Sequence, residues 1–210
     1  MFVDGDPQGY DQINLPDNWE MVIGSEVSDR GNLAGSKQYI LKRFPSERVY
    51  GWLADDNVPI TQNWSYIIED IAYPWYLVHG KDCWVSEQEP PSNYYLFRTK
   101  NLGGGICWGG DLVRSVGYWA PPGIIQGGID WFWTSICGDT PLGVYLHNVV
   151  VKHHNWRTGH RAKDDNDNLE KKHVKEDVAY MGKHIKSQGF LDLRERVLRE
   201  YGEYITRRTE

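Results

Sequence analysis

The segment Gly143–His160 reads GVYLHNVVVKHHNWRTGH and holds four of the seven histidines in the chain. Pro141 suits the first position of a helix, with Asp139 or Thr140 as its cap. The apolar residues that follow recur at helical spacing, namely Leu142, Tyr145, Leu146, Val149 and Val150. The segment therefore predicts a helix that begins at Pro141 and ends near Gly159.

The spacing of the histidines argues against a metal site in this helix. His147 and His154 would lie two turns apart, roughly 10 Å along the axis, whereas helical zinc ligands stand about one turn apart. The adjacent His153 and His154 would point in directions that differ by about 100°. The sequence therefore indicates no metal ion and no cofactor.

Upstream of this segment the sequence favours strands. Between about Lys37 and Tyr118, short runs rich in Tyr, Ile, Val and Trp, such as QYILKRF and VYGWL, alternate with Gly, Pro and Asn. The run SYIIEDIAY fits either a short helix or a strand that ends at Pro74. The run YWAPPGIIQGGIDWFW predicts an irregular loop packed against the core, because bulky residues interrupt its glycines and prolines.

Downstream of the histidine-rich segment the apolar spacing predicts two further helices. One carries Val174, Val178, Met181 and Ile185 on one face, and Gly189 can end it; the next carries Leu193, Val197, Leu198, Tyr201 and Ile205. The sequence thus predicts an α+β protein with a β-rich N-terminal half and about three C-terminal helices. We expect an extended arm or loop-rich lead-in over residues 1–35, a single α+β domain over 36–190, and a C-terminal helix and tail over 191–210.

Composition and charge narrow the class of protein. No apolar run approaches the roughly 20 residues of a membrane span, and the N-terminus lacks a signal-peptide pattern, which predicts a soluble protein made in the cytoplasm. The net charge of -6 argues against nucleic acid as the main partner. That charge is uneven, because residues 152–210 hold 14 Lys and Arg against 11 Asp and Glu. Cys83, Cys107 and Cys137 match neither a disulfide framework nor a zinc pattern, which predicts buried reduced thiols.

Three familiar motifs fail on inspection. A calcium loop beginning at Asp164 would place Leu169 where Gly is needed and Lys175 where Glu is needed. The glycine-rich run Asn101–Gly110 has neither a phosphate-loop ending nor a dinucleotide fingerprint. A Gly-x-Ser-x-Gly nucleophile elbow is absent from the sequence.

The aromatic content points to binding. Ten Trp and thirteen Tyr supply large, partly polar surfaces of the kind enriched at protein interfaces and in sugar-binding clefts. The candidate binding residues are Trp119, Trp131, Trp133 and Trp156.

Three blocks between about residues 94 and 190 resemble a family of phage and prophage proteins of unknown function. They read PPGIIQGGIDWFW (Pro121–Trp133), VVVKHHNWRTG (Val149–Gly159) and KEDVAYMGKHIKSQG (Lys175–Gly189). The family's corresponding blocks are Pro-x-Gly-Phe-x-Thr-Asp, a helix with His-Asp-x-Leu-Tyr, and a helix that opens Glu-Ala-Asp-x-x-Phe. The order of the blocks carries the resemblance, which implies a protein used by a phage.

The resemblance also suggests a histidine site. A His-Asp pair on one helix with an Asp on the next looks like the layout of secreted phospholipase A2, and here it implies His154 as general base, Asn155 beside it and Asp177 as orienting carboxylate. The family's Asp is replaced by Asn155, and its Thr-Asp by Gln126 and Gly127. Because a neutral amide stabilises neither calcium nor an imidazolium as a carboxylate does, the sequence leaves enzymatic activity open.

Two hypotheses of different classes follow. The favoured one is a structural or accessory protein of the virion, with no catalytic activity, that binds other phage proteins or copies of itself. The alternative is a histidine-dependent hydrolase acting on lipid or cell-wall material during entry or lysis. Sugar binding through Trp and Tyr is compatible with both.

Overall fold

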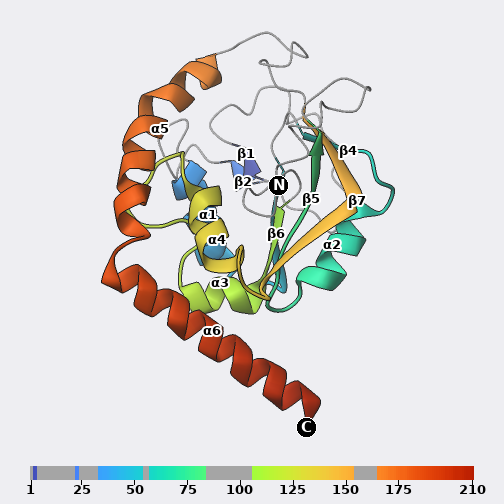
Figure 1. The fold of residues 1–210 in the computed structure, drawn as a ribbon. Helices are drawn as coiled ribbons and strands as arrows, with labels where there is room; N and C mark the ends of the chain where they lie inside the picture. The colour runs from blue at the N-terminus through green and yellow to red at the C-terminus, as the bar shows by residue number, and fades with distance from the viewer. Residues whose placement is uncertain (1, 4–21, 24–32, 54–56, 84–105, 154–164) are drawn as a thin grey trace.

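The computed structural model describes residues 2–3, 22–23, 33–53, 57–83, 106–153 and 165–210 (Figure 1). Most of the expected arm over residues 1–35 lies outside these ranges, apart from a two-stranded parallel sheet of β1 and β2 and the start of α1. In chain order the elements are β1 (Phe2–Val3), β2 (Val22–Ile23), α1 (Leu33–Arg43), β3 (Val49–Trp52), β4 (Asn57–Pro59), α2 (Trp64–Ala72), β5 (Leu77–Cys83), β6 (Ile106–Gly109), α3 (Gly110–Val116), α4 (Ile129–Cys137), β7 (Gly143–His153), α5 (Asp165–His184) and α6 (Gln188–Thr209).

The centre of the fold is a mixed five-stranded sheet in the order β3-β6-β5-β7-β4. Strands β5 and β7 run parallel, and the other neighbouring strands pair antiparallel. The protein is therefore α+β, as the sequence predicts, with strands concentrated in the first half and long helices at the C-terminus (Figure 1).

Helices cover both faces of this sheet. Successive residues of a strand point to opposite faces, so strands β3, β5 and β6 contribute side chains to both of the apolar clusters. Leu77 and Trp108 belong to the larger apolar cluster, which includes residues of α1, α3, α4, α5 and α6. Their neighbours Val78 and Cys107 face the other way, into a smaller cluster with Ile68 of α2. Figure 1 shows the same division, with α2 beside β7 and the remaining helices across the sheet.

The helix predicted from Pro141 to Gly159 is wrong, because the structure has strand β7 over Gly143–His153. This strand lies between β5 and β4, so both of its edges are paired, and it reads as an apolar run that only His147 and Asn148 interrupt before Lys152. Such a run does not distinguish strand from helix by periodicity alone. Three consecutive valines, 149–151, favour the strand, and pairing with β5 and β4 fixes it.

The strand predicted from Lys37 is also wrong, because QYILKRF begins within helix α1. The apolar group Tyr39–Leu41 is too short to separate the two periodicities. The ambiguous run SYIIEDIAY lies mostly in helix α2. Ile68 and Ala72, one helical turn apart, are both fully buried on the face that α2 turns to the sheet.

The loop after α3 is packed against the core as predicted, with Trp119, Ala120 and Ile124 buried. Its last residues were expected to be irregular but form helix α4, whose Phe132 and Ile136 are buried at helical spacing. The two C-terminal helices are present as α5 and α6. Helix α6 runs diagonally away from the body (Figure 1). The expected division of the chain at residue 190 stays a prediction.

Helix α6 is attached by polar contacts along its length. Ser115 Oγ of α3 donates to Glu200 Oε2 at 2.5 Å, and Arg194 Nε donates to the Ser135 carbonyl of α4 at 3.1 Å. The hydroxyls of Tyr76 and Tyr201 lie 3.2 Å apart. None of the helices in the described ranges is long and apolar enough to cross a membrane.

Candidate functional site

The carboxylate of Asp177 is the centre of a contact between α5 and the loop over residues 118–128. Its Oδ2 accepts the backbone N–H groups of Gln126 at 2.7 Å and Gly127 at 2.8 Å, and its Oδ1 accepts that of Ile125 at 3.2 Å. The side chain is 4 % exposed. Three N–H donors satisfy most of the hydrogen-bonding needs of a buried carboxylate, so Asp177 holds the loop in one conformation.

The same loop is held from its other side by α1. Ala34 N–H donates to the Ile125 carbonyl at 2.9 Å. Gln38 bonds the loop twice, with Oε1 accepting the Trp119 N–H at 2.9 Å and Nε2 donating to the Ala120 carbonyl at 3.2 Å. The loop therefore joins the first helix of the domain to the fifth through backbone groups that helix and strand pairing leave free.

The predicted catalytic group is only partly within the described residues. His154 and Asn155 lie outside them, as does Trp156, so the proposed contact between His154 and Asp177 stays a prediction. What the structure adds is the set of partners that Asp177 already has. Any histidine that approaches this carboxylate shares it with the N–H groups of Ile125, Gln126 and Gly127.

The tryptophans predicted to bind a partner have very different surroundings. Trp119 and Trp133 are 2 % and 0 % exposed, and Trp133 Nε1 donates to the Trp119 carbonyl at 2.8 Å. Both rings pack against Trp108, so neither offers a surface to a partner in this structure. Trp131, two residues before Trp133 on α4, is 37 % exposed and is the described candidate that a partner can reach.

A buried lysine lies beside this tryptophan cluster. Lys37 of α1 is 5 % exposed, and its Nζ lies 3.3 Å from the ring centroid of Trp52 on β3 and 6.0 Å from that of Trp119. The aromatic faces attract the ammonium, whereas burial penalises its charge. Burial is the dominant cause and lowers the pKa of Lys37 to about 7.

Sequence reasoning missed Lys37 because it was assigned to a strand. Read as a helix, α1 brings Leu33, Lys37 and Ile40 to one face, with Leu41 adjacent. A single lysine at a core-facing position of an otherwise apolar helical face is the signal that identifies it. The pattern can be recognised only when residues 33–43 are read as a helix.

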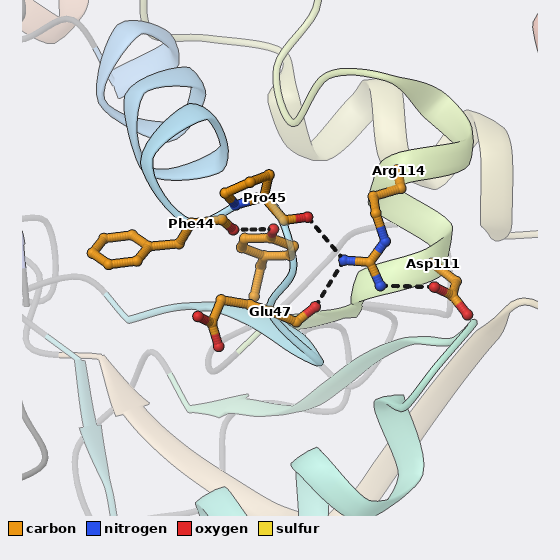
Figure 2. A network of polar contacts seen from close by, with 6 residues as sticks. Phe44, Pro45, Glu47, Asp111 and Arg114 are labelled. Atoms are coloured by element: carbon orange, nitrogen blue, oxygen red, sulfur yellow. Dashed lines mark hydrogen bonds and ion pairs between the residues drawn. The ribbon is translucent and has the colours of Figure 1, made fainter.

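A second polar network fastens the turn between α1 and β3 to α3 (Figure 2). Arg114 Nη1 donates to the carbonyls of Pro45 and Glu47 at 3.1 and 2.9 Å, while its Nη2 pairs with Asp111 at 2.7 Å. Tyr50 OH donates to the Phe44 carbonyl in the same turn. Because the guanidinium bonds backbone carbonyls and is exposed, the network serves to position the turn.

The described thiols are buried within the core. Cys107 and Cys137 are free, and burial raises the pKa of both, that of Cys107 to about 12. A thiol that stays protonated is a poor nucleophile and a poor metal ligand. Within the described ranges, no three side chains of His, Cys, Asp or Glu come together as a potential metal site. Of Cys83, the third cysteine, the structure describes only the backbone in β5.

Comparison with known proteins does not assign a family. No protein-family model, no curated protein and no solved structure matches the chain significantly.

Proposed function

We propose that this protein acts by binding other proteins rather than by catalysis, as a structural or accessory component of a phage particle. The proposal is supported by the apolar surface that Trp131 forms with α5. Trp is enriched at protein interfaces and among the few residues that supply most of their binding energy.

The surface consists of three residues on two helices. The ring of Trp131 lies against Gly182 of α5, where an added Cβ would be 3.5 Å from the Cη2 atom of the indole. Val178 is one turn earlier on α5 and is 43 % exposed. The absence of a side chain at Gly182 lets the edge of the indole approach α5 closely, while Trp131 and Val178 both remain exposed to a partner.

The phage setting of the proposal rests on the order of three sequence blocks. Two of these blocks, 121–133 and 175–189, lie in the described part of the chain, and Asp177 of the later block bonds Gln126 and Gly127 of the earlier one. The two blocks thus depend on each other in the fold. Because the contact needs residues from both blocks, we expect the two blocks to occur together in one chain.

The test is affinity purification of the tagged full chain from cells producing the source phage, followed by quantitative mass spectrometry. We expect virion proteins to be enriched with the native chain and lost with Trp131→Ser. Tyr66→Ser is the matched control, because Tyr66 is 73 % exposed on α2 and should not affect binding. Equal recovery of every protein with both variants would refute a role for the Trp131 surface.

The histidine-dependent hydrolase is the alternative, and one observation favours it. Among the described residues, Asp177 Oδ1 accepts one long bond, from Ile125 N–H at 3.2 Å, which Oδ2 shares at 3.3 Å, whereas Oδ2 also accepts the two short bonds. A carboxylate oxygen accepts two bonds, which leaves Oδ1 able to accept an imidazole N–H. The test is hydrolysis of phospholipid vesicles and of purified peptidoglycan: activity that disappears in His154→Ala and persists in Glu176→Ala would replace the binding proposal.

A further inference from the structure

We propose that Lys37 is a covalent binding site for small carbonyl compounds, which form an imine with its side-chain amine. This role is independent of the proposed protein binding. It rests on the position of the amine over the Trp52 ring and near Trp119, on the absence of Asp and Glu from the described segments around it, and on buried indole N–H donors in the adjoining cluster.

Within the described ranges, the segments that bring Lys37 and its two indoles together provide no carboxylate to hold a cation. These segments are α1, β3 and the loop over 118–128, and none of the three contains Asp or Glu. Their titratable or cationic groups are Tyr39, Lys42 and Arg43 on α1, Tyr50 on β3 and Tyr118 in the loop. Side chains of these types are not a source of negative charge at neutral pH, so they do not favour the charged form of Lys37.

The neutral amine is therefore a substantial species at neutral pH. With its pKa lowered to about 7, about half of the Lys37 side chains carry a lone pair at pH 7. An exposed lysine with the ordinary pKa is neutral in fewer than about one in a thousand molecules at that pH. Lysines that are desolvated in apolar surroundings are the ones that act as amine nucleophiles.

Two indole N–H groups in the adjoining cluster have no hydrogen-bond partner in the part of the chain that the structure describes. Trp119 Nε1 and Trp108 Nε1 are both buried without a hydrogen-bond acceptor among the described residues. The two rings are in edge contact, with centroids 5.2 Å apart, and Trp119 is the second indole beside Lys37. Unpaired buried donors are rare and favour a ligand that brings an acceptor oxygen.

The chemistry requires no additional reactant. The Lys37 nitrogen attacks the carbonyl carbon, the oxygen takes up the two amine protons and leaves as water, and a carbon–nitrogen double bond remains. The N–H of Trp119, the second indole near the amine, can donate to the carbonyl oxygen as negative charge develops on it. A small aldehyde is the probe of choice, since Lys37 is 5 % exposed.

The test uses the full native chain, acetaldehyde and sodium cyanoborohydride, which reduces an imine to a stable ethylamine. Mass spectrometry of peptides then gives the extent of labelling at Lys37 and at Lys42, an exposed lysine on the same helix. We expect Lys37 to be labelled at least tenfold faster than Lys42 at pH 7. That ratio should fall at least tenfold by pH 9, because the neutral fraction of an exposed lysine rises about a hundredfold over this range.

Two further measurements test whether the fast labelling of Lys37 depends on the folded site and on its indole N–H donor. In urea the unfolded chain should label both lysines equally. Trp119→Phe keeps an aromatic ring but removes one N–H donor, and should slow labelling of Lys37 without changing that of Lys42, with circular dichroism confirming that the variant is folded. Labelling of Lys42 as fast as Lys37 at pH 7 in the native chain would overturn the proposal.

Discussion

The backbone N–H of Gly127 donates to Asp177 Oδ2 at 2.8 Å and connects two positions fifty residues apart in the chain. Gln126 N–H bonds the same oxygen, and the neighbouring Ile125 carbonyl accepts a bond from Ala34 of α1. One short loop thus links α1, α4 and α5. Its backbone groups are satisfied by specific partners from distant parts of the sequence, so the loop forms only in the complete fold.

Replacement of Asp177 by Ala should lower the free energy of unfolding by about 3 kcal/mol. The change removes a charged acceptor and leaves three buried N–H groups without it. Urea denaturation measures the loss, and limited proteolysis should show new cleavage between residues 118 and 128. The control is Glu176→Ala, an exposed neighbour on the same helix, which should change stability by less than about 0.5 kcal/mol. Similar losses in the two variants would contradict the assigned role.

Truncation of Trp133 should destabilise the protein much more than truncation of Trp131, although the two residues are only two positions apart on α4. Trp133→Ala creates a cavity beside Trp108 and Phe132 and should cost about 3–5 kcal/mol of stability. Trp131→Ala removes a partly exposed ring and should cost about 1 kcal/mol or less. Chemical denaturation of the two variants under identical conditions checks the difference. A larger loss from Trp131 than from Trp133 would mean that the core is assigned incorrectly.

Gly109→Ala should destabilise the protein strongly, by about 3 kcal/mol or more. A Cβ at this position, where β6 passes directly into α3, would overlap the Pro74 carbonyl oxygen. That oxygen is fixed, because it accepts the Asp111 N–H at 3.1 Å. Gly189→Ala on α6 is the matched control, with no atom within 4 Å of the added Cβ, and should be neutral or slightly stabilising. Thermal denaturation distinguishes the two; a fully stable Gly109→Ala protein would show that the junction can move.

Titration of Lys37 should make the free energy of unfolding increase with pH. The pKa of Lys37 is about 7 in the folded protein and 10.5 without the fold, so between these values the unfolded chain binds more protons. Stability therefore rises as pH increases through this window and is lowest below pH 7. Between pH 6.5 and 8.5 we expect a gain of about 2 kcal/mol from this group.

The control for this dependence is Lys37→Met, which keeps an unbranched side chain and cannot titrate. Denaturation midpoints of the variant should lack the rise and exceed those of the native protein at pH 6.5. The range stops at pH 8.5 because the buried thiols act with the opposite sign. Burial raises the pKa of Cys107 to about 12, so that its contribution to stability is lost above about pH 9. Parallel curves for the two proteins would disprove a buried titrating lysine.

Local sequence patterns correctly predicted part of the fold. The C-terminal helices follow from apolar spacing such as Phe190 with Val197, two turns apart and both buried in α6. The packed loop follows from bulky residues between prolines and glycines, since Trp119 and Ile124 are buried within it. Both predictions depend only on residues close together in the chain, which is why they hold.

The assignments that failed depend on partners distant in the chain. β7 is a strand because β5 pairs with it from about 66 positions upstream, Leu77 with Gly143, and because β4 covers its other edge. The same non-local packing decided which tryptophans are reachable, since Trp131 and Trp133 differ in burial but not in residue type.

The sequence by itself determined the α+β class and the apolar faces of the C-terminal helices, because these depend on composition and on short-range periodicity. Only the tertiary structure decided that Gly143–His153 is a strand, that Asp177 holds a loop fifty residues away, and that Lys37 is buried beneath Trp52. The physical reason is that strand pairing, burial and a lowered pKa arise from what surrounds a residue in space, and that environment comes from remote parts of the chain.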